Sequence, residues 1–183
     1  MKNILIIGAI IFITFVFINN FKPEIGERGA AETGKTLTTP FKYAGLLAKE
    51  PETQIEMPVR NLGRKQIADT FGAPRGNDRA HQGQDIFAKR GTPVYSATNG
   101  YVWRVGQNNL GGNIVMVLGA GGRMYYYAHL EKHAENLQVG DEVSTETVLG
   151  YVGTSGNAKG TPPHLHFGIY SAGGAINPLD LLK

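Results

Sequence analysis

The pattern of hydrophobic and polar positions divides the chain into three parts. Residues 4–18 form a nearly continuous apolar run that only Gly8 and Thr14 dilute. Residues 22–57 are mixed in charge and show no sustained period of 2 or 3.6. From residue 58 onward, short apolar runs alternate with glycine-rich segments. We therefore expect a signal anchor or signal peptide over 1–21, a linker over 22–57 and one folded domain over 58–183.

The N-terminal run has the character of an export signal. Lys2 precedes it, and with residues 19–21 it approaches the shortest length that spans a membrane. A buried core helix would show polar residues at helical spacing, which this run lacks. No small-residue cleavage site follows directly. We expect an uncleaved inner-membrane anchor over residues 4–21, with late cleavage and secretion as the alternative. Both place the rest of the chain outside the cytoplasm, in the periplasm or cell envelope.

Six apolar runs in the second half of the chain predict β-strands. Each is five or six residues long and rich in Val, Ile or Tyr, which favour strands. They cover residues 93–97, 101–105, 113–118, 123–128, 148–152 and 165–170. Glycine-containing pairs that suit tight hairpin turns stand between them, at Asn99-Gly100, Gly111-Gly112, Gly121-Gly122 and Gly173-Gly174. No stretch of twelve residues carries a helical stripe, so the predicted class is an all-β antiparallel sandwich or barrel, with a helical turn at 131–137.

Composition restricts the chemistry more than the fold. The 183 residues include no Cys, which excludes a disulfide scaffold, a thiolate zinc finger, an iron–sulfur cluster and a cysteine nucleophile. Any metal must therefore be held by nitrogen and oxygen. The formal charge of +3 resides entirely in residues 58–183, which carry 12 Lys and Arg against 9 Asp and Glu. Such a mild excess suits an anionic polymer, and we expect no nucleic-acid partner.

Four histidines stand in positions that suggest a metal site. His81 precedes Asp85 by four residues in an extended segment, where an even spacing puts both side chains on one face. His164 and His166 share one face of a predicted strand, and His129 ends another. A catalytic zinc ion takes three ligands of the His or carboxylate type and keeps one position open for water. The combination, in a chain without Cys, indicates a zinc site.

The order of the motifs resembles the lysostaphin-type, LytM-like zinc metallopeptidases, which cut the peptide bridges of bacterial peptidoglycan. The resemblance covers roughly residues 58–183 and includes His-x-x-x-Asp, Tyr-x-Tyr-Ala-His-Leu, Gly-Asp-x-Val and Pro-His-Leu-His-Phe. It implies a β-sandwich or barrel-like domain with a duplicated hybrid motif. By the resemblance, His81, Asp85 and His166 bind one Zn²⁺, and the remaining two histidines, His129 and His164, flank the metal-bound water as acid–base groups.

The implied activity is that of a zinc-dependent endopeptidase. It would hydrolyse peptide stems or cross-bridges of peptidoglycan by direct attack of zinc-activated water, and we expect it to be monomeric. The alternative from another class is a catalytically inactive LytM-like module that binds or activates another wall hydrolase. Such modules lack one or more zinc ligands, whereas all five groups are present here. A cupin-like barrel would need a Glu soon after the His-x-His pair, and a lipoyl-like carrier would need a turn lysine; the chain has neither.

A few positions depart from the family pattern. Glu146 stands where a turn glycine is common, and residues 161–163 read Thr-Pro-Pro where Thr-Gly-Pro is more usual. Neither change removes a catalytic group. His133 has no counterpart in the family motifs, and we expect a solvated loop residue there. Of the three consecutive tyrosines at 125–127, we expect Tyr127 to reach the cleft.

Overall fold

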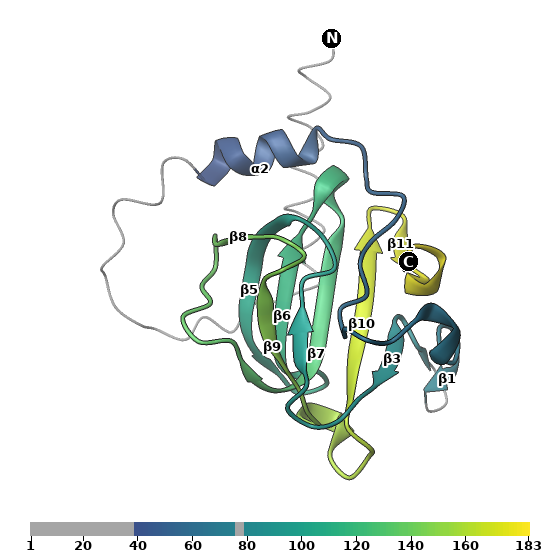
Figure 1. Cartoon of the computed structure of the whole chain (residues 1–183). Helices are drawn as coiled ribbons and strands as arrows, with labels where there is room; N and C mark the ends of the chain where they lie inside the picture. Colours follow the sequence, from purple (N-terminus) through teal and green to yellow (C-terminus); the bar gives the residue numbers. More distant parts are fainter. Residues whose placement is uncertain (1–38, 76–78) are drawn as a thin grey trace. The chain divides into compact units, whose positions relative to one another are not determined.

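The structure is a computed structural model that describes residues 39–75 and 79–183 (Figure 1). Contacts divide the chain into two units, Met1–Ala44 and Gly45–Lys183. The predicted anchor over residues 4–21 lies outside the described residues. Within those that are described, no helix is long and apolar enough to cross a membrane.

Short strands dominate the unit that begins at Gly45. The helix α2 (Thr39–Leu47) precedes most of it, and four short 3₁₀ helices interrupt the strands: η1 (Arg64–Gln66), η2 (Ala120–Gly122), η3 (Gly156–Ala158) and η4 (Pro178–Asp180). The strands are β1 (Pro74–Arg75), β2 (Arg79–Ala80), β3 (Gln84–Phe87), β4 (Pro93–Tyr95), β5 (Gly100–Asn108), β6 (Gly112–Leu118), β7 (Met124–His133), β8 (Glu142–Val143), β9 (Val148–Val152), β10 (His164–Ser171) and β11 (Gly174–Ile176).

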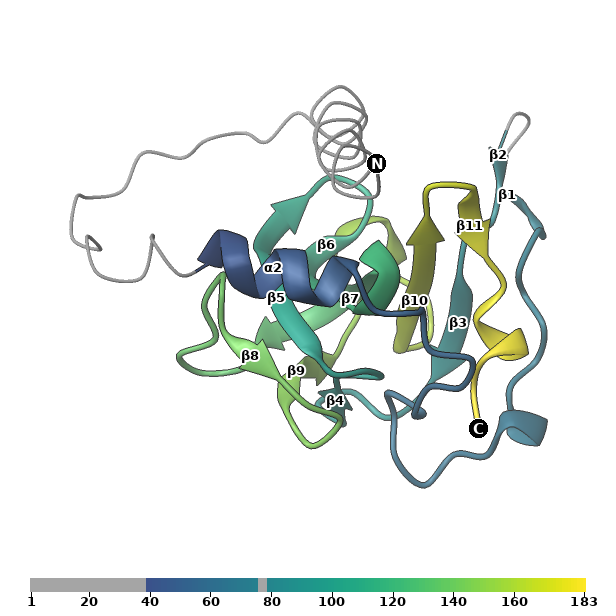
Figure 2. The same cartoon turned by 90° about the horizontal axis from the view of Figure 1, so that it is seen from above.

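Strands β3 to β11 form one branched sheet, which Figure 2 shows from above. Its main path runs β11-β10-β7-β6-β5-β8, while β3 pairs with β10, and β9 pairs with both β4 and β7. β7 carries the branch because its first residues pair with β6 and β10, whereas Leu130 to His133 pair with β9. All pairs between these named strands are antiparallel. The predicted all-β antiparallel class is confirmed.

The apolar core lies among the inner faces of these strands, because alternate side chains point to opposite faces of a strand. It joins residues of nearly every long strand with the C-terminal segment. Fully buried members include Ile86, Val94, Val102, Val115, Val117, Tyr125, Tyr127, Leu130, Leu149, Val152, Leu165, Phe167 and Ile169. The site described below lies on strands that are fixed by this core.

The six predicted strands are all present, but three local predictions are wrong. Asn99-Gly100 is not a hairpin turn: Gly100 begins β5, and a Cβ there would overlap the carbonyl oxygen of Leu118 on β6. The predicted helical turn at 131–137 is wrong: residues 131–133 are the end of β7, which pairs with β9 there, and a turn follows at residues 135–136. His133 is not a solvated loop residue either, since its Nε2 lies 3.1 Å from the carbonyl oxygens of both Gly106 and Ile114.

The segment before residue 58 packs onto the sheet unit. Ile55 is only 2% exposed, belongs to the core and forms an isolated parallel bridge with Leu182. Its N–H donates to the carbonyl of Leu181 (2.9 Å). The division at residue 58 stays a prediction, and Ile55 is the residue that tests it.

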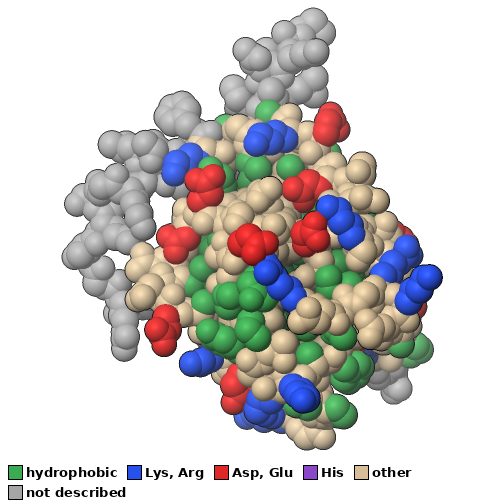
Figure 3. Space-filling model, in the orientation of Figure 1, with side chains coloured by type: hydrophobic (Ala, Val, Ile, Leu, Met, Phe, Trp, Pro, Cys, Tyr) green, Lys and Arg blue, Asp and Glu red, His purple; other side chains and the backbone are tan. Residues whose placement is uncertain are grey.

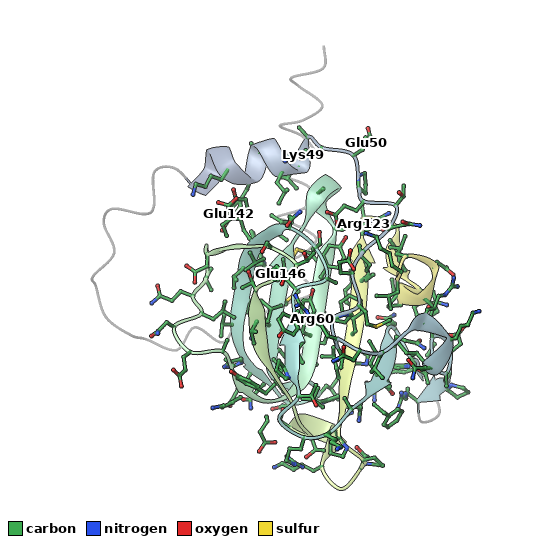
Figure 4. All side chains as sticks on the ribbon, in the orientation of Figure 1. Lys49, Glu50, Arg60, Arg123, Glu142 and Glu146 are labelled. Carbon is green, nitrogen blue, oxygen red and sulfur yellow. The ribbon has the colours of Figure 1, made fainter. Side chains whose placement is uncertain are left out.

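Charged side chains of both signs lie on the surface of this unit, and some of them form ion pairs. Arg60 lies 2.6 Å from the Glu146 carboxylate, near the centre of the view in Figure 4. Its guanidinium also lies 3.9 Å from the ring centroid of Tyr95 in β4. On the face shown in Figure 3, basic and acidic side chains are interspersed rather than gathered by sign.

Candidate metal centre

The register of β3 against β10 brings the first two predicted motifs together. Asp85 lies directly opposite His166, and Phe87 lies opposite His164. Residues two apart on a strand share a face, so Asp85 and Phe87 face the same side as the two histidines. His81, four residues before Asp85, lies just outside β3 and turns its ring toward the same point.

Three side-chain atoms from these residues form a small triangle. His81 Nε2 lies 2.8 Å from His166 Nδ1 and 3.0 Å from Asp85 Oδ1, and the third side, from His166 Nδ1 to Asp85 Oδ1, is 3.1 Å. His81 and Asp85 are buried and His166 is nearly so. These residues form the one group of potential metal ligands found among the described part of the chain.

Hydrogen bonds on the outer side of the triangle orient its members. His81 Nδ1 lies 2.7 Å from the carbonyl oxygen of Thr70. The Nη2 of Arg75 lies 3.2 Å from the same nitrogen, but the Thr70 carbonyl is closer and only accepts. We therefore place the proton of the neutral ring on Nδ1, and this leaves the Nε2 lone pair for a metal ion. The guanidinium of Arg75 donates to Asp85 Oδ2, which leaves Oδ1 for the triangle.

The charge of Asp85 is stabilised in this setting. Burial would raise the pKa of its carboxyl group, but the close contacts of the carboxylate with His166, His81 and Arg75 outweigh burial and hold the pKa below its usual value. Asp85 is therefore a carboxylate near neutral pH. A carboxylate and an imidazole lone pair in close contact favour a positive centre between them.

His164 lies beside the triangle on the same strand as His166. Its Nε2 is 4.0 Å from Asp85 Oδ1, and its Nδ1 donates to the carbonyl of Pro162 (2.9 Å). The ring of Phe87, which is 55% exposed, lies against it with centroids 5.3 Å apart. Strand alternation therefore brings both histidines of the His-x-His motif to the site, as predicted.

His129 reaches the same cluster from β7. Its ring centroid is 5.0 Å from that of His164 and 5.8 Å from that of His166. Its Nδ1 donates to the carbonyl of Ser155 (2.9 Å), so Nε2 is the nitrogen left to accept a proton. Burial lowers the pKa of His129 to about 4, and the ring is neutral at pH 7.

The tyrosine that faces the site is Tyr126, and the prediction of Tyr127 is wrong. Tyr127 is fully buried in the core, and its hydroxyl accepts from the N–H of Ala97 (2.9 Å). The ring of Tyr126 is edge-on to His166, with centroids 6.0 Å apart. Under strict alternation Tyr127 and His129 would share a face, but His129 has a φ of 62°, which breaks the alternation between them.

Gly83 leaves room for the ring of His166. A Cβ at this position would lie 2.7 Å from His166 Cε1 and 2.8 Å from the carbonyl oxygen of Phe167. Both distances are too short for real side chains. The glycine between His81 and Asp85 is thus a packing requirement of the site.

Comparison with known sequences identifies the family. Residues 79–178 match the family model described as Peptidase family M23. The match covers more than half of the chain and contains the five residues that converge at the site, which are His81, Asp85, His129, His164 and His166. The chain belongs to peptidase family M23. The resemblance to lysostaphin-type enzymes is confirmed, and family M23 is a family of metallopeptidases.

Several curated proteins are similar to this M23 chain. The L-Ala–D-Glu endopeptidase of Bacillus subtilis is 39% identical over 130 residues, which are 67% of this chain and 39% of that protein. Lysostaphin of Staphylococcus simulans is 34% identical over 113 residues, 58% of this chain and 22% of that protein. The M23 chain therefore spans less than half the length of these relatives.

Solved structures of similar proteins have the same fold. The catalytic domain of lysostaphin from Staphylococcus simulans superposes with a TM-score of 0.56 at 32% identity, covering 63% of this chain and 92% of that domain. Csd3 of Helicobacter pylori superposes with a TM-score of 0.59 at 31% identity, covering 72% of this chain and 35% of that protein.

The donor set fits a zinc ion. Zinc in proteins is bound by imidazole nitrogen and carboxylate oxygen at about 2.0–2.2 Å, which in a tetrahedron separates the ligand atoms by about 3.3 Å. The three donor atoms lie 2.8–3.1 Å apart, so a small outward shift would accommodate the ion. The Thr70 carbonyl supplies the outer hydrogen bond that metal-binding histidines generally have.

Proposed function

We propose that this M23 chain is a zinc-dependent endopeptidase that hydrolyses peptide cross-links of bacterial peptidoglycan. The observation that carries the proposal is the convergence of His81, Asp85 and His166 on one point, with His129 and His164 beside it. Similar proteins support the substrate class. They include an L-Ala–D-Glu endopeptidase and a peptidoglycan DD-endopeptidase of Vibrio cholerae, which is 31% identical over 122 residues.

In this proposal the triangle holds the metal. His81 would bind through Nε2, His166 through Nδ1 and Asp85 through Oδ1. When bound, zinc supplies a Lewis acid that activates water and polarises the scissile carbonyl. Arg75 holds the second oxygen of Asp85, and this favours binding through Oδ1 alone.

The two neighbouring histidines serve proton transfer. Each donates its Nδ1 proton to a backbone carbonyl, and this keeps the ring in place with Nε2 directed away from that carbonyl. Burial holds His129 neutral at pH 7, so the lone pair of its Nε2 is free at the start of the reaction. We assign His129 and His164 together to taking the proton from water and delivering one to the leaving amine.

The proposed substrate determines where the enzyme would act. We place the enzyme outside the cytoplasm, in the periplasm or cell envelope, where peptidoglycan is found. Residues 4–21 would anchor it in the inner membrane, and it would act as a monomer.

Metal content and wall digestion test the proposal together. The purified chain should contain about one zinc ion and should clear a suspension of purified peptidoglycan. A chelator should stop the clearing, and added zinc should restore it. Mass analysis of the released peptides identifies the bond that is cut. Binding of zinc without hydrolysis of any wall peptide would overturn the proposal in favour of an inactive module that acts on another hydrolase.

A further inference from the structure

Gln84 is a buried polar side chain that the proposed mechanism does not use. It lies in β3 between Gly83 and Asp85 and is 0% exposed. Its Nε2 donates to the carbonyl oxygen of Ala68. Its Oε1 accepts from the backbone N–H of Thr70 at 3.2 Å and from the Thr70 hydroxyl at 3.3 Å. The side-chain amide of Gln84 therefore bonds to both ends of the loop 68–70.

Thr70 in turn contacts two members of the triangle. Its carbonyl oxygen accepts from His81 Nδ1 at 2.7 Å. Its Oγ1 accepts from the backbone N–H of Asp85 at 3.0 Å, while the hydroxyl hydrogen is donated to Gln84. One residue outside the sheet thus fixes the ring of His81 and the backbone of Asp85.

From these contacts we infer that Thr70, clamped by Gln84, is the positioning residue of the metal centre. Its carbonyl keeps the proton of His81 on Nδ1, so that Nε2 is free to bind metal. Its hydroxyl oxygen holds the backbone N–H of Asp85 and so fixes the position of that residue. The inference rests on the proposed function, because it presumes that the triangle binds a metal. It predicts that metal affinity depends on two residues that do not touch the metal.

Packing alone does not account for Gln84. Gln84 and Ile86 alternate with Asp85 along β3 and share the inner face, where Ile86 is fully buried. An apolar side chain of similar length at position 84 would fill this space without the need for hydrogen-bond partners. A buried amide costs about 1–3 kcal/mol wherever a partner is missing. The Gln84 side chain bonds to the loop 68–70 through both its amide nitrogen and its amide oxygen, so its particular contribution is to hold that loop.

The test measures metal affinity in variants of the purified full chain. Thr70→Val removes the hydroxyl at nearly constant shape, and Gln84→Met removes the clamp. Competition with a chromophoric chelator should show zinc affinity about 10–100-fold weaker in both, the usual loss when an outer-shell partner is removed. Thr70→Ser keeps the hydroxyl and should restore affinity. With Co²⁺ as the probe, the visible absorption bands should change in Thr70→Val and return in Thr70→Ser.

Thr98→Val is the matched control. Thr98 is also buried, and its hydroxyl bonds to Glu52 and to the Asn99 carbonyl, outside the cluster. It should lower stability but leave zinc affinity and the Co²⁺ spectrum unchanged. Unchanged affinity in Thr70→Val and Gln84→Met, or an equal loss in Thr98→Val, would overturn the inference while leaving the proposed function intact. If the unchanged chain bound no metal, the proposed metal centre would fail, and the inference with it.

Discussion

A single backbone angle at His129 changes which side chains face the candidate metal centre. Its φ of 62° lies in the left-handed region, which costs a non-glycine residue on the order of 1–3 kcal/mol. Two hydrogen bonds offset this strain: its N–H donates to the carbonyl of Gly111 (2.7 Å), and its ring donates to the carbonyl of Ser155. The angle brings the imidazole to the site while Tyr127 remains in the core.

At the residue scale, substitutions can separate the proposed metal-binding role of Asp85 from the proposed proton-transfer role of His164. Asp85→Ala should lose zinc and activity together, because two remaining ligands bind zinc poorly. His164→Ala should keep zinc and lose about 10²–10⁴-fold in rate, the usual contribution of an acid–base group. Zinc content by elemental analysis and the rate of wall-peptide hydrolysis measure the two effects.

His133→Ala is the control for these variants. His133 bonds to carbonyls of β5 and β6 and lies outside the cluster, so this change should keep both zinc and rate. A loss of zinc in His164→Ala as large as that in Asp85→Ala would contradict the division of roles.

At the scale of elements, two loops meet to support His129. They are the β5–β6 turn and the segment that leads into η3. A Cβ on Gly112 would overlap the backbone N of Gly156, so the two loops pack backbone against backbone. Ser155 joins them: its Oγ accepts from the N–H of Asn113 (2.9 Å) and donates to the carbonyl of Leu130 (2.7 Å). The loops and β7 therefore form one support for the ring.

We expect Ser155→Ala to weaken this support. It leaves the Asn113 N–H without this partner, and the free energy of unfolding should fall by about 1–3 kcal/mol. The carbonyl that holds His129 should shift as well, so kcat should fall while zinc content is retained. Urea unfolding and steady-state kinetics measure the two changes. Ser144→Ala, in an exposed turn, should change stability by less than about 0.5 kcal/mol. Full activity in Ser155→Ala would show that these loops do not position His129.

At the scale of the whole molecule, the strands share their core with segments distant in the sequence. Ile55 packs with the C-terminal segment, and the Lys183 N–H donates to its carbonyl (3.2 Å). The cooperative unit should therefore extend to residues before 58.

Substitution of Ile55 tests this extent. Ile55→Ala should lower the free energy of unfolding by about 2–5 kcal/mol, as expected for a buried Ile. Val139→Ala, at a position that is 55% exposed, should change it by less than about 0.5 kcal/mol. Denaturant unfolding followed by circular dichroism makes the comparison. Equal effects of the two changes would instead support a folded domain that begins at residue 58.

Local sequence patterns determined much of this protein. Runs rich in Val, Ile and Tyr predicted the strands, because β-branched and aromatic side chains pack well on a pleated sheet surface. The spacing of His164 and His166 predicted a shared face for the same reason. The order of motifs indicated a resemblance to lysostaphin-type peptidases and, through it, five candidate site residues. These features depend on neighbours along the chain, and the sequence displays such neighbours directly.

Only the tertiary structure decided which distant segments these elements contact. The register of β7 against β10 puts Tyr126 rather than Tyr127 on the face of His166. The positive φ at His129 brings its ring to the same face, and no local pattern marks such an angle at a histidine. The contacts of Thr70 with Gln84 join a loop without periodicity to a strand. Ile55 and Leu182 form a bridge although they lie near opposite ends of the domain in the sequence. Register and packing between distant segments set these contacts, because each depends on how the other strands close around a common core.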